Sequence, residues 1–319
     1  MSPPRRQALL LVLCWVLLAA CTARNDPPPA ENHDSTAQAL LGDPRTVDPC
    51  TLIDPAAITG FGEATNAGTV SLDYCLLHVE PADRTLIQLA VGELVPFDPS
   101  QGDPIVREGG LRIAKNAPVP GHCSREVLFD DGLAMQVSAD LLEGKPSRGL
   151  CELADSGARA VAAALQQRRA GHRDTPPNSL ALVDPCGVLD TRFVRQVPGL
   201  ENARPRPSPT GHQCAWGEQA ADSPRVQLVH TAGQPPRLLH GAAVEEKVAD
   251  RRTVISVVGG DPSVPLCSAE TGHIPFGDPG EVEVAQLVVA LPGSDGTEAC
   301  EYARGLARLA WPKLPPANP

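Results

Sequence analysis

Eight cysteines in two sets of four constrain the fold of this chain more than any other feature. Successive separations are 25, 48 and 28 residues in the first set and 28, 53 and 33 in the second. The same order of a short, a long and a short separation therefore occurs twice. The tetrapeptide Val-Asp-Pro-Cys ends at the first cysteine of each set. Such a framework indicates disulfide-bonded cysteines in an exported chain. The two sets are Cys50, Cys75, Cys123 and Cys151, and Cys186, Cys214, Cys267 and Cys300.

The residues around the cysteines repeat as well. VDPCTLIDPAAITG matches VDPCGVLDTRFVRQ, and GLCELADSGARAVAAAL matches EACEYARGLARLAW. TLIQLAV matches PRVQLVH, which aligns Gln88 with Gln227. We therefore predict one four-cysteine domain present twice, because a single large domain would need all these matches to arise by chance. The predicted segments are repeat one at 46–168, a loop-like linker at 169–182, repeat two at 183–312 and a short tail at 313–319.

The N-terminal residues have the pattern of an export signal. Arg5 and Arg6 precede an apolar run of 13 residues, Ala8–Ala20, and Cys21 follows directly. The run is too short for a membrane-spanning helix, which needs about 20 residues. Leu-Ala-Ala-Cys at its end resembles a bacterial lipobox, whose cysteine thiol accepts a diacylglyceryl group. An ordinary signal peptide that contains a cysteine, or an uncleaved anchor, is the alternative.

This pattern predicts a lipoprotein signal peptide at 1–20, with Cys14 inside it. It predicts a lipid anchor on Cys21, bearing fatty acyl chains such as palmitate. The polar, proline-rich residues that follow predict a flexible tether at 21–45. We therefore expect the protein on the outer face of the cytoplasmic membrane, held there by its lipid.

Composition excludes one class of partner and limits the cores. The net charge is −11, whereas binding of nucleic acid needs basic patches. Aromatic residues make up 3% of the chain, so base-stacking platforms are scarce and the cores must be aliphatic. Small cores of that kind gain from disulfide bonds.

Periodicity within each repeat predicts a short helix, several antiparallel strands and a closing helix. Asp54 and Asp190 stand at helix N-cap positions. Alternating apolar residues in LDYCLLHVE and TLIQLAVGEL predict strands, and VLFDDGLAMQVSA predicts a hairpin that turns at Asp131-Gly132. Apolar residues recur at helical spacing after Cys151 and after Cys300. The predicted class is α+β: two tandem copies of a disulfide-stapled domain, each an antiparallel sheet covered by N- and C-terminal helices.

Four cysteines allow three pairings in each repeat. We favour sequential pairing, because one bridge would then join the opening helix to a strand and the other would join the closing helix to the strand region before it. A metal site is the rival interpretation, but no Cys-x-x-Cys or clustered Cys/His spacing supports it. The favoured pairs are 50–75, 123–151, 186–214 and 267–300.

These features together resemble a known group of proteins. An Asp-Pro-Cys start, a Cys-Ala-Trp at Cys214–Trp216 and the lipobox are similar to an uncharacterised domain family of actinobacterial lipoproteins. The chain is also distantly similar to the disulfide-stapled extracellular sensor domains of mycobacterial receptor kinases. Repeat one departs from the motif, with Leu77 at the position of the tryptophan. The resemblance implies an envelope location and a binding or sensing role, and it transfers no catalytic residue.

The sequence contains no recognisable catalytic motif or cofactor motif. His122 and His212 lie beside non-equivalent cysteines, so we expect exposed turn residues rather than a shared site. The adjacent carboxylates Asp130-Asp131 and Glu245-Glu246 do not form an acid/base pair if they lie on strands, because neighbours on a strand point to opposite faces. We therefore expect a protein that is not an enzyme and binds no cofactor or metal.

Two functions from different classes remain for such a chain. We favour a ligand-binding or sensing lipoprotein, whose two modules could each hold a cleft or share one at their junction. The alternative is an interaction lipoprotein that binds another envelope protein without a small-molecule site; a hydrolase of envelope polymers is a third possibility. Only repeat two carries the insert RPRPSP before Cys214, so we expect at most one copy to retain a ligand site.

Overall fold

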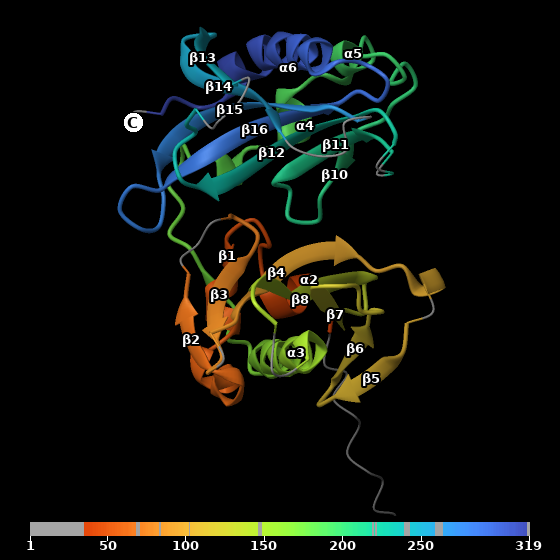
Figure 1. Ribbon diagram of the computed structural model, residues 1–319, viewed down its shortest axis with the longest axis vertical. Helices are drawn as coiled ribbons and strands as arrows, with labels where there is room; N and C mark the ends of the chain where they lie inside the picture. The colour runs from red at the N-terminus through yellow and green to blue at the C-terminus, as the bar shows by residue number, and fades with distance from the viewer. Residues whose placement is uncertain are drawn as a thin grey trace, which may run out of the picture. The chain divides into compact units, whose positions relative to one another are not determined.

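A computed structural model describes residues 35–317, apart from 68–70, 83, 102, 146–148, 219, 221, 239–242 and 259–263. The predicted signal peptide, Cys21 and most of the predicted tether lie outside the described residues. The residues from Ser35 onward form one compact unit. This unit contains two seven-stranded antiparallel sheets, and a long helix follows the last strand of each sheet in the chain (Figure 1).

The sheet of repeat one has the strand order β2-β3-β4-β8-β7-β6-β5. Its strands alternate as predicted, because every second side chain enters a core shared with the helix and the intervening ones do not. The predicted hairpin at Asp131-Gly132 joins β7 to β8. The strands are β2 Glu63–Asn66, β3 Cys75–Glu80, β4 Leu86–Pro96, β5 Ile105–Glu108, β6 Leu111–Lys115, β7 His122–Leu128 and β8 Leu133–Glu143.

The sheet of repeat two has the equivalent order, β10-β11-β12-β16-β15-β14-β13. Identical order of seven strands agrees with the duplication inferred from the cysteines. The strands are β10 Arg206–Pro207, β11 Gln213–Gly217, β12 Arg225–Gly233, β13 Ala243–Val248, β14 Arg251–Val258, β15 Leu266–Pro275 and β16 Val282–Ala290.

The register of the two sheets corrects one detail of the repeat alignment. Cys75 pairs with Val91, and Cys214 pairs with Leu228. Counted from these cysteines, Gln227 is equivalent to Ala90, and Gln88 is not its counterpart. The match of TLIQLAV to PRVQLVH was therefore wrong by two residues. A two-residue shift leaves every side chain on the same face of a strand, so the apolar pattern could not detect it.

The closing helices are α3, Leu150–Gln166, and α6, Gly296–Ala310. In repeat one, Leu153, Val161 and Leu165 of α3 are buried in one cluster with β4 and β8. In repeat two, apolar side chains of α6 are buried in one hydrophobic cluster with side chains of β12, β15 and β16 (Figure 1). The short turn η5, Trp311–Lys313, continues from α6 and buries Trp311.

Pairs of short turns open each repeat where we predicted one short helix. They are η1 Pro49–Leu52 and η2 Pro55–Phe61 in repeat one, and α4 Pro185–Val188 and α5 Thr191–Val194 in repeat two. Each turn is capped by an aspartate whose side chain accepts a backbone N–H, so Asp54 and Asp190 are N-caps as predicted. In each pair, the first turn is followed by a residue with extended backbone, Ile53 or Leu189, which prevents the two turns from merging.

Three segments predicted to be irregular are folded. Within the predicted tether, α2, Ala37–Leu41, is helical and buries Leu41 in the core of repeat one. The predicted linker contains β9, Gly171–His172, which pairs with β1, Val47–Asp48. The predicted tail packs as well: Leu314 is buried, and Asn178 donates a hydrogen bond to the carbonyl of Pro316.

All eight cysteines pair sequentially, as predicted. The Cys50–Cys75 and Cys186–Cys214 bridges join the opening turns to a strand in repeats one and two respectively. The other two bridges, Cys123–Cys151 and Cys267–Cys300, join the closing helices to β7 and β15.

The two closing helices begin differently, and this difference predicts a stability effect. Asp295 caps α6 by accepting the backbone N–H of Glu298 at 2.8 Å, whereas Gly149 at the start of α3 offers no side chain. We expect Asp295→Ala to lower the free energy of unfolding by about 1 kcal/mol. Urea unfolding measures it, with Asp295→Asn as the control that restores most of the loss. An unchanged stability in the alanine variant would contradict the assigned cap.

Candidate functional site

The linker places a charged side chain between elements of both repeats. Pairing of Gly171 with Asp48 fixes the chain just before Arg173, whose own N–H donates to the carbonyl of Thr46 at 2.8 Å. The guanidinium donates from Nη1 to the carbonyl of Leu72 at 2.7 Å. It also lies over the ring of Phe276 in repeat two, 5.2 Å from the ring centre.

Arg173 is largely shielded from solvent but incompletely bonded. Its side chain is 15% exposed, and burial lowers its pKa below the usual value while Asp48 and Asp73 oppose that effect. Nη2 is buried and makes no hydrogen bond in the described structure, although Oδ1 of Asp48 lies 3.6 Å away. A guanidinium holds five N–H donors in a fixed plane, so this group can still donate to an incoming anion.

A buried carboxyl group lines the same space. Glu283 of β16 is 2% exposed. Its Oε1 accepts from the Ser179 hydroxyl at 2.5 Å, and its Oε2 accepts from the N–H of Leu180 at 2.6 Å. Burial raises the pKa of Glu283 by more than these hydrogen bonds and the charge of His212 lower it. The linker therefore holds Glu283 in position through the turn η4, Leu180–Leu182.

Apolar side chains from three parts of the chain form the floor between these groups. Leu72 of repeat one, Ala181 of the linker and Ala232 of repeat two form one buried cluster, against which Phe276 packs. The space above this floor is a cavity of about 370 Å³, which we call the junction cavity. Its size and its apolar floor with a few buried charges are typical of small-molecule sites. Arg45, Asp48, Arg173, Ser179, Phe276 and Glu283 are among its lining residues.

His212 is buried, and our prediction that it is an exposed turn residue was wrong. It is 1% exposed. Nδ1 lies 2.6 Å from Oδ1 of Asp73, and Nε2 lies 3.1 Å from the carbonyl of Arg45. His212 of repeat two thus contacts Asp73 of repeat one and the backbone of Arg45, which lines the cavity.

A second buried histidine was missed entirely at the sequence level. His230 of β12 is fully buried, and Nδ1 lies 3.1 Å from the carbonyl of Leu180. Burial is the main cause that lowers its pKa to about 4, and the positive charges of His212 and His273 add to the effect. His230 therefore stays neutral where an exposed histidine would be charged.

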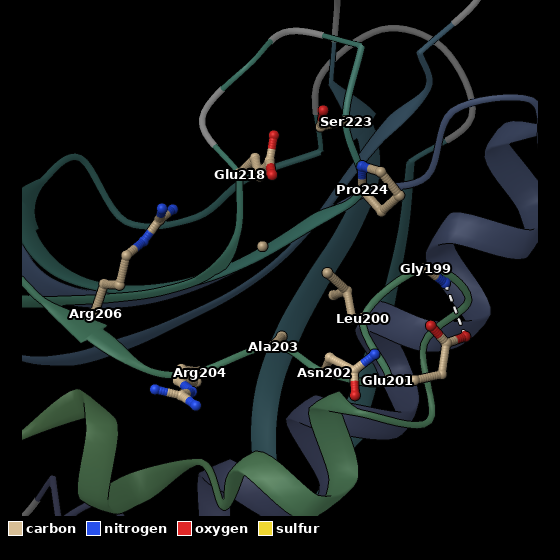
Figure 2. Close-up of a pocket in the computed structure, with 11 residues that line it drawn as sticks. Gly199, Leu200, Glu201, Asn202, Ala203, Arg204, Arg206, Glu218, Ser223 and Pro224 are labelled. Atoms are coloured by element: carbon tan, nitrogen blue, oxygen red, sulfur yellow. Dashed lines mark hydrogen bonds between the residues drawn. The ribbon is translucent and has the colours of Figure 1, made fainter.

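A larger cavity of about 570 Å³ lies in repeat two, between the insert before Cys214 and the turn from β11 to β12 (Figure 2). Arg204, Arg206 and Glu218 project around it without converging on one point, and all three are exposed. The one hydrogen bond drawn runs from the N–H of Gly199 to Glu201 at 3.0 Å. We favour the smaller junction cavity because Arg173 and Glu283 in its lining are largely shielded from solvent, and electrostatic interactions strengthen as water is removed.

The structure also places the carboxylate pairs considered as catalytic groups. Glu245 pairs with Arg252, and Glu246 pairs with Arg304 of α6, so the two point apart as expected. Asp131 accepts a hydrogen bond from the N–H of Ala37, and Asp130 forms an ion pair with Arg112. Each of these two carboxylates therefore contacts a different structural partner.

Two further observations concern the described part of the chain. No three His, Cys, Asp or Glu side chains in it are placed to hold a metal ion. None of its helices is long and apolar enough to cross a membrane.

Comparison with known proteins gives little further information. No protein-family model matches the chain, and no curated protein matches it. Among solved structures, the di-domain ARO/CYC StfQ from the steffimycin biosynthetic pathway aligns over 83% of this chain and 94% of its own, at 11% identity and a TM-score of 0.19. The di-domain ARO/CYC BexL from the BE-7585A biosynthetic pathway aligns over 76% and 90%, at 13% identity and a TM-score of 0.15. TM-scores of this size do not indicate a shared fold.

Proposed function

We propose that this protein is an exported, lipid-anchored binding or sensing protein that holds a small amphiphilic anion in the junction cavity. The observation that carries the proposal is Arg173, a buried guanidinium with an unbonded Nη2 beside an apolar floor. The export signal pattern and four disulfides agree with an oxidising compartment outside the cytoplasm. Binding without chemical turnover is the role proposed.

The residues of the cavity limit what it can accept. An anionic group would displace the weak interaction of Arg173 with Asp48 and form two parallel hydrogen bonds to the guanidinium. The remainder of the ligand would cover Leu72, Ala181 and Phe276, and would be apolar. Glu283 already accepts two hydrogen bonds from the linker, so ligand binding that moves the linker would alter this carboxyl group.

Two matched probes test the proposal. We expect isothermal titration of the full chain to show one site for decanoate and roughly 10-fold weaker binding of the neutral decanol. The Arg173→Met variant should bind both probes equally, because it keeps the apolar stem and removes the charge. Arg204→Met, in the exposed cavity of repeat two, is the matched control and should bind as the unaltered chain does. Equal affinity of the unaltered chain for the two probes would refute the anionic site.

A further inference from the structure

A separate hollow lies on the face of the repeat-one sheet that is turned away from α3. Cys75, Leu77, Leu89 and Val137 point toward the helix, so their neighbours along each strand point to the other face. That second face holds a cavity of about 160 Å³. Its lining includes Tyr74, Gln88, Ala90, Gln136, Ser138 and Asp140.

The register of four adjacent strands explains why the hollow forms. One row across the sheet consists of four polar residues, His78, Gln88, Asp140 and His122. The next row consists of Leu76, Ala90, Ser138 and Ser124, whose central members are small. Gln136 and Glu126 stand in the row beyond. Small side chains between two polar rows leave a depression with a polar wall.

Some polar side chains of this hollow are fixed by hydrogen bonds, and others still have hydrogen-bonding groups without a partner in the described part of the chain. Asp140 lies 2.6 Å from Nδ1 of His122 and accepts the Ser138 hydroxyl at 3.0 Å. The side chains of Gln88 and Gln136 make no hydrogen bond to another described residue. Each amide offers two donors and one carbonyl acceptor. These two amides lie in the same hollow as the Ser138 hydroxyl and the Asp140 carboxylate. Such a set of groups suits a neutral ligand that both donates and accepts hydrogen bonds.

The equivalent positions of repeat two carry larger side chains, which gives an internal comparison. Gln227 and Val288 occupy the places of Ala90 and Ser138. Ala290 stands in place of Asp140. Gln286 is held by Glu270, to whose Oε1 it donates at 2.8 Å, whereas its counterpart Gln136 has no such bond. Among the described residues, repeat one therefore has small floor residues, a carboxylate and an unbonded glutamine at positions where repeat two does not.

We infer that the repeat-one hollow binds one ring of a neutral, polyhydroxylated ligand such as a sugar. Hydroxyl groups exchange donor and acceptor roles as the two amides do, so each amide can form a paired interaction with a sugar diol. The carboxylates of Asp140 and Glu93 at the hollow disfavour an anion. This site is independent of the junction cavity and of the ligand proposed for it.

Side-chain amide NMR signals provide the test. The full chain would be titrated with methyl α-D-glucopyranoside, methyl α-D-mannopyranoside and myo-inositol, up to about 50 mM, because weak single-ring binding corresponds to a Kd near 1 mM. We expect at least one probe to shift the Gln88 and Gln136 amide signals in a saturable way. Gln136→Leu and Gln88→Leu should each weaken binding roughly 10-fold, while Gln227→Leu on repeat two should leave it unchanged.

Two results would overturn the inference. One is the absence of saturable shifts at both amides with all three probes. The other is binding that persists unchanged in both leucine variants, since the sugars would then be held elsewhere. The titration with decanoate reports on the junction cavity alone, so either proposal can fail without the other.

Discussion

Removal of the Cys267–Cys300 bridge is expected to lower the free energy of unfolding by about 4 kcal/mol in the Cys267→Ala/Cys300→Ala variant. The bridge closes a loop with a sequence separation of 33 residues and joins α6 to β15. Without it the unfolded chain gains the conformational freedom that the cross-link had removed. Trp216 and Trp311 are both buried in repeat two, so tryptophan fluorescence during urea unfolding follows the affected repeat.

A second pair of substitutions separates the cross-link from the packing of the sulfur atoms. Cys267→Ser/Cys300→Ser removes the same bridge but places hydroxyl groups at one buried and one partly buried position. The loss common to both variants measures the cross-link. A common loss below about 1 kcal/mol would show that the bridge contributes little to stability, contrary to the loop argument.

Acid is expected to weaken the fold by up to about 3 kcal/mol through His230 alone, since each pKa unit corresponds to about 1.4 kcal/mol. The pKa is lowered to about 4 in the folded chain, against about 6.5 when unfolded. A lowered pKa means that the unfolded state binds the proton more tightly. The contribution is therefore fully present above about pH 6.5 and is lost as the pH falls toward 4.

Comparison with one variant isolates this effect from other titrating groups. Burial raises the pKa of Glu283, which acts in the opposite direction, and lowers that of His273, which acts in the same direction. His230→Gln keeps a donor for the Leu180 carbonyl and does not titrate. The difference in unfolding free energy between the two chains should shrink by about 3 kcal/mol from pH 7 to pH 4. A difference independent of pH would show that His230 is not buried as a neutral group.

Local patterns predicted much of the fold because the determinants lie close together in the sequence. The two sets of four cysteines and the elements that sequential pairing would join predicted the four bridges, which all join residues within one repeat. Strand and helix periods predicted the antiparallel strands and the closing helices. The opening helices were predicted less well, because aspartate caps indicate where turns begin and do not determine whether they continue.

The site depends on contacts that sequence patterns do not reveal. Arg173 and Glu283 lie far apart in the sequence, and only the fold brings them to one cavity. The linker that holds them was predicted to be a loop, because a two-residue strand such as β9 has no periodicity to detect. His212 and His230 also gave no signal, because a lone histidine carries the same pattern whether it is exposed or buried. The expectation that the two modules could share a cleft at their junction came closest to predicting this site from the sequence.

Native mass spectrometry of the full chain, extracted from the membranes of its own source, would show whether the junction cavity holds a ligand. We expect a bound small anion that leaves on denaturation and that is lost from the Arg173→Met variant but not from Arg204→Met. The denatured mass should include a diacylglyceryl group on Cys21 and four disulfides. A native mass with no bound molecule, or a ligand retained by Arg173→Met, would contradict the assignment of the junction cavity as the binding site.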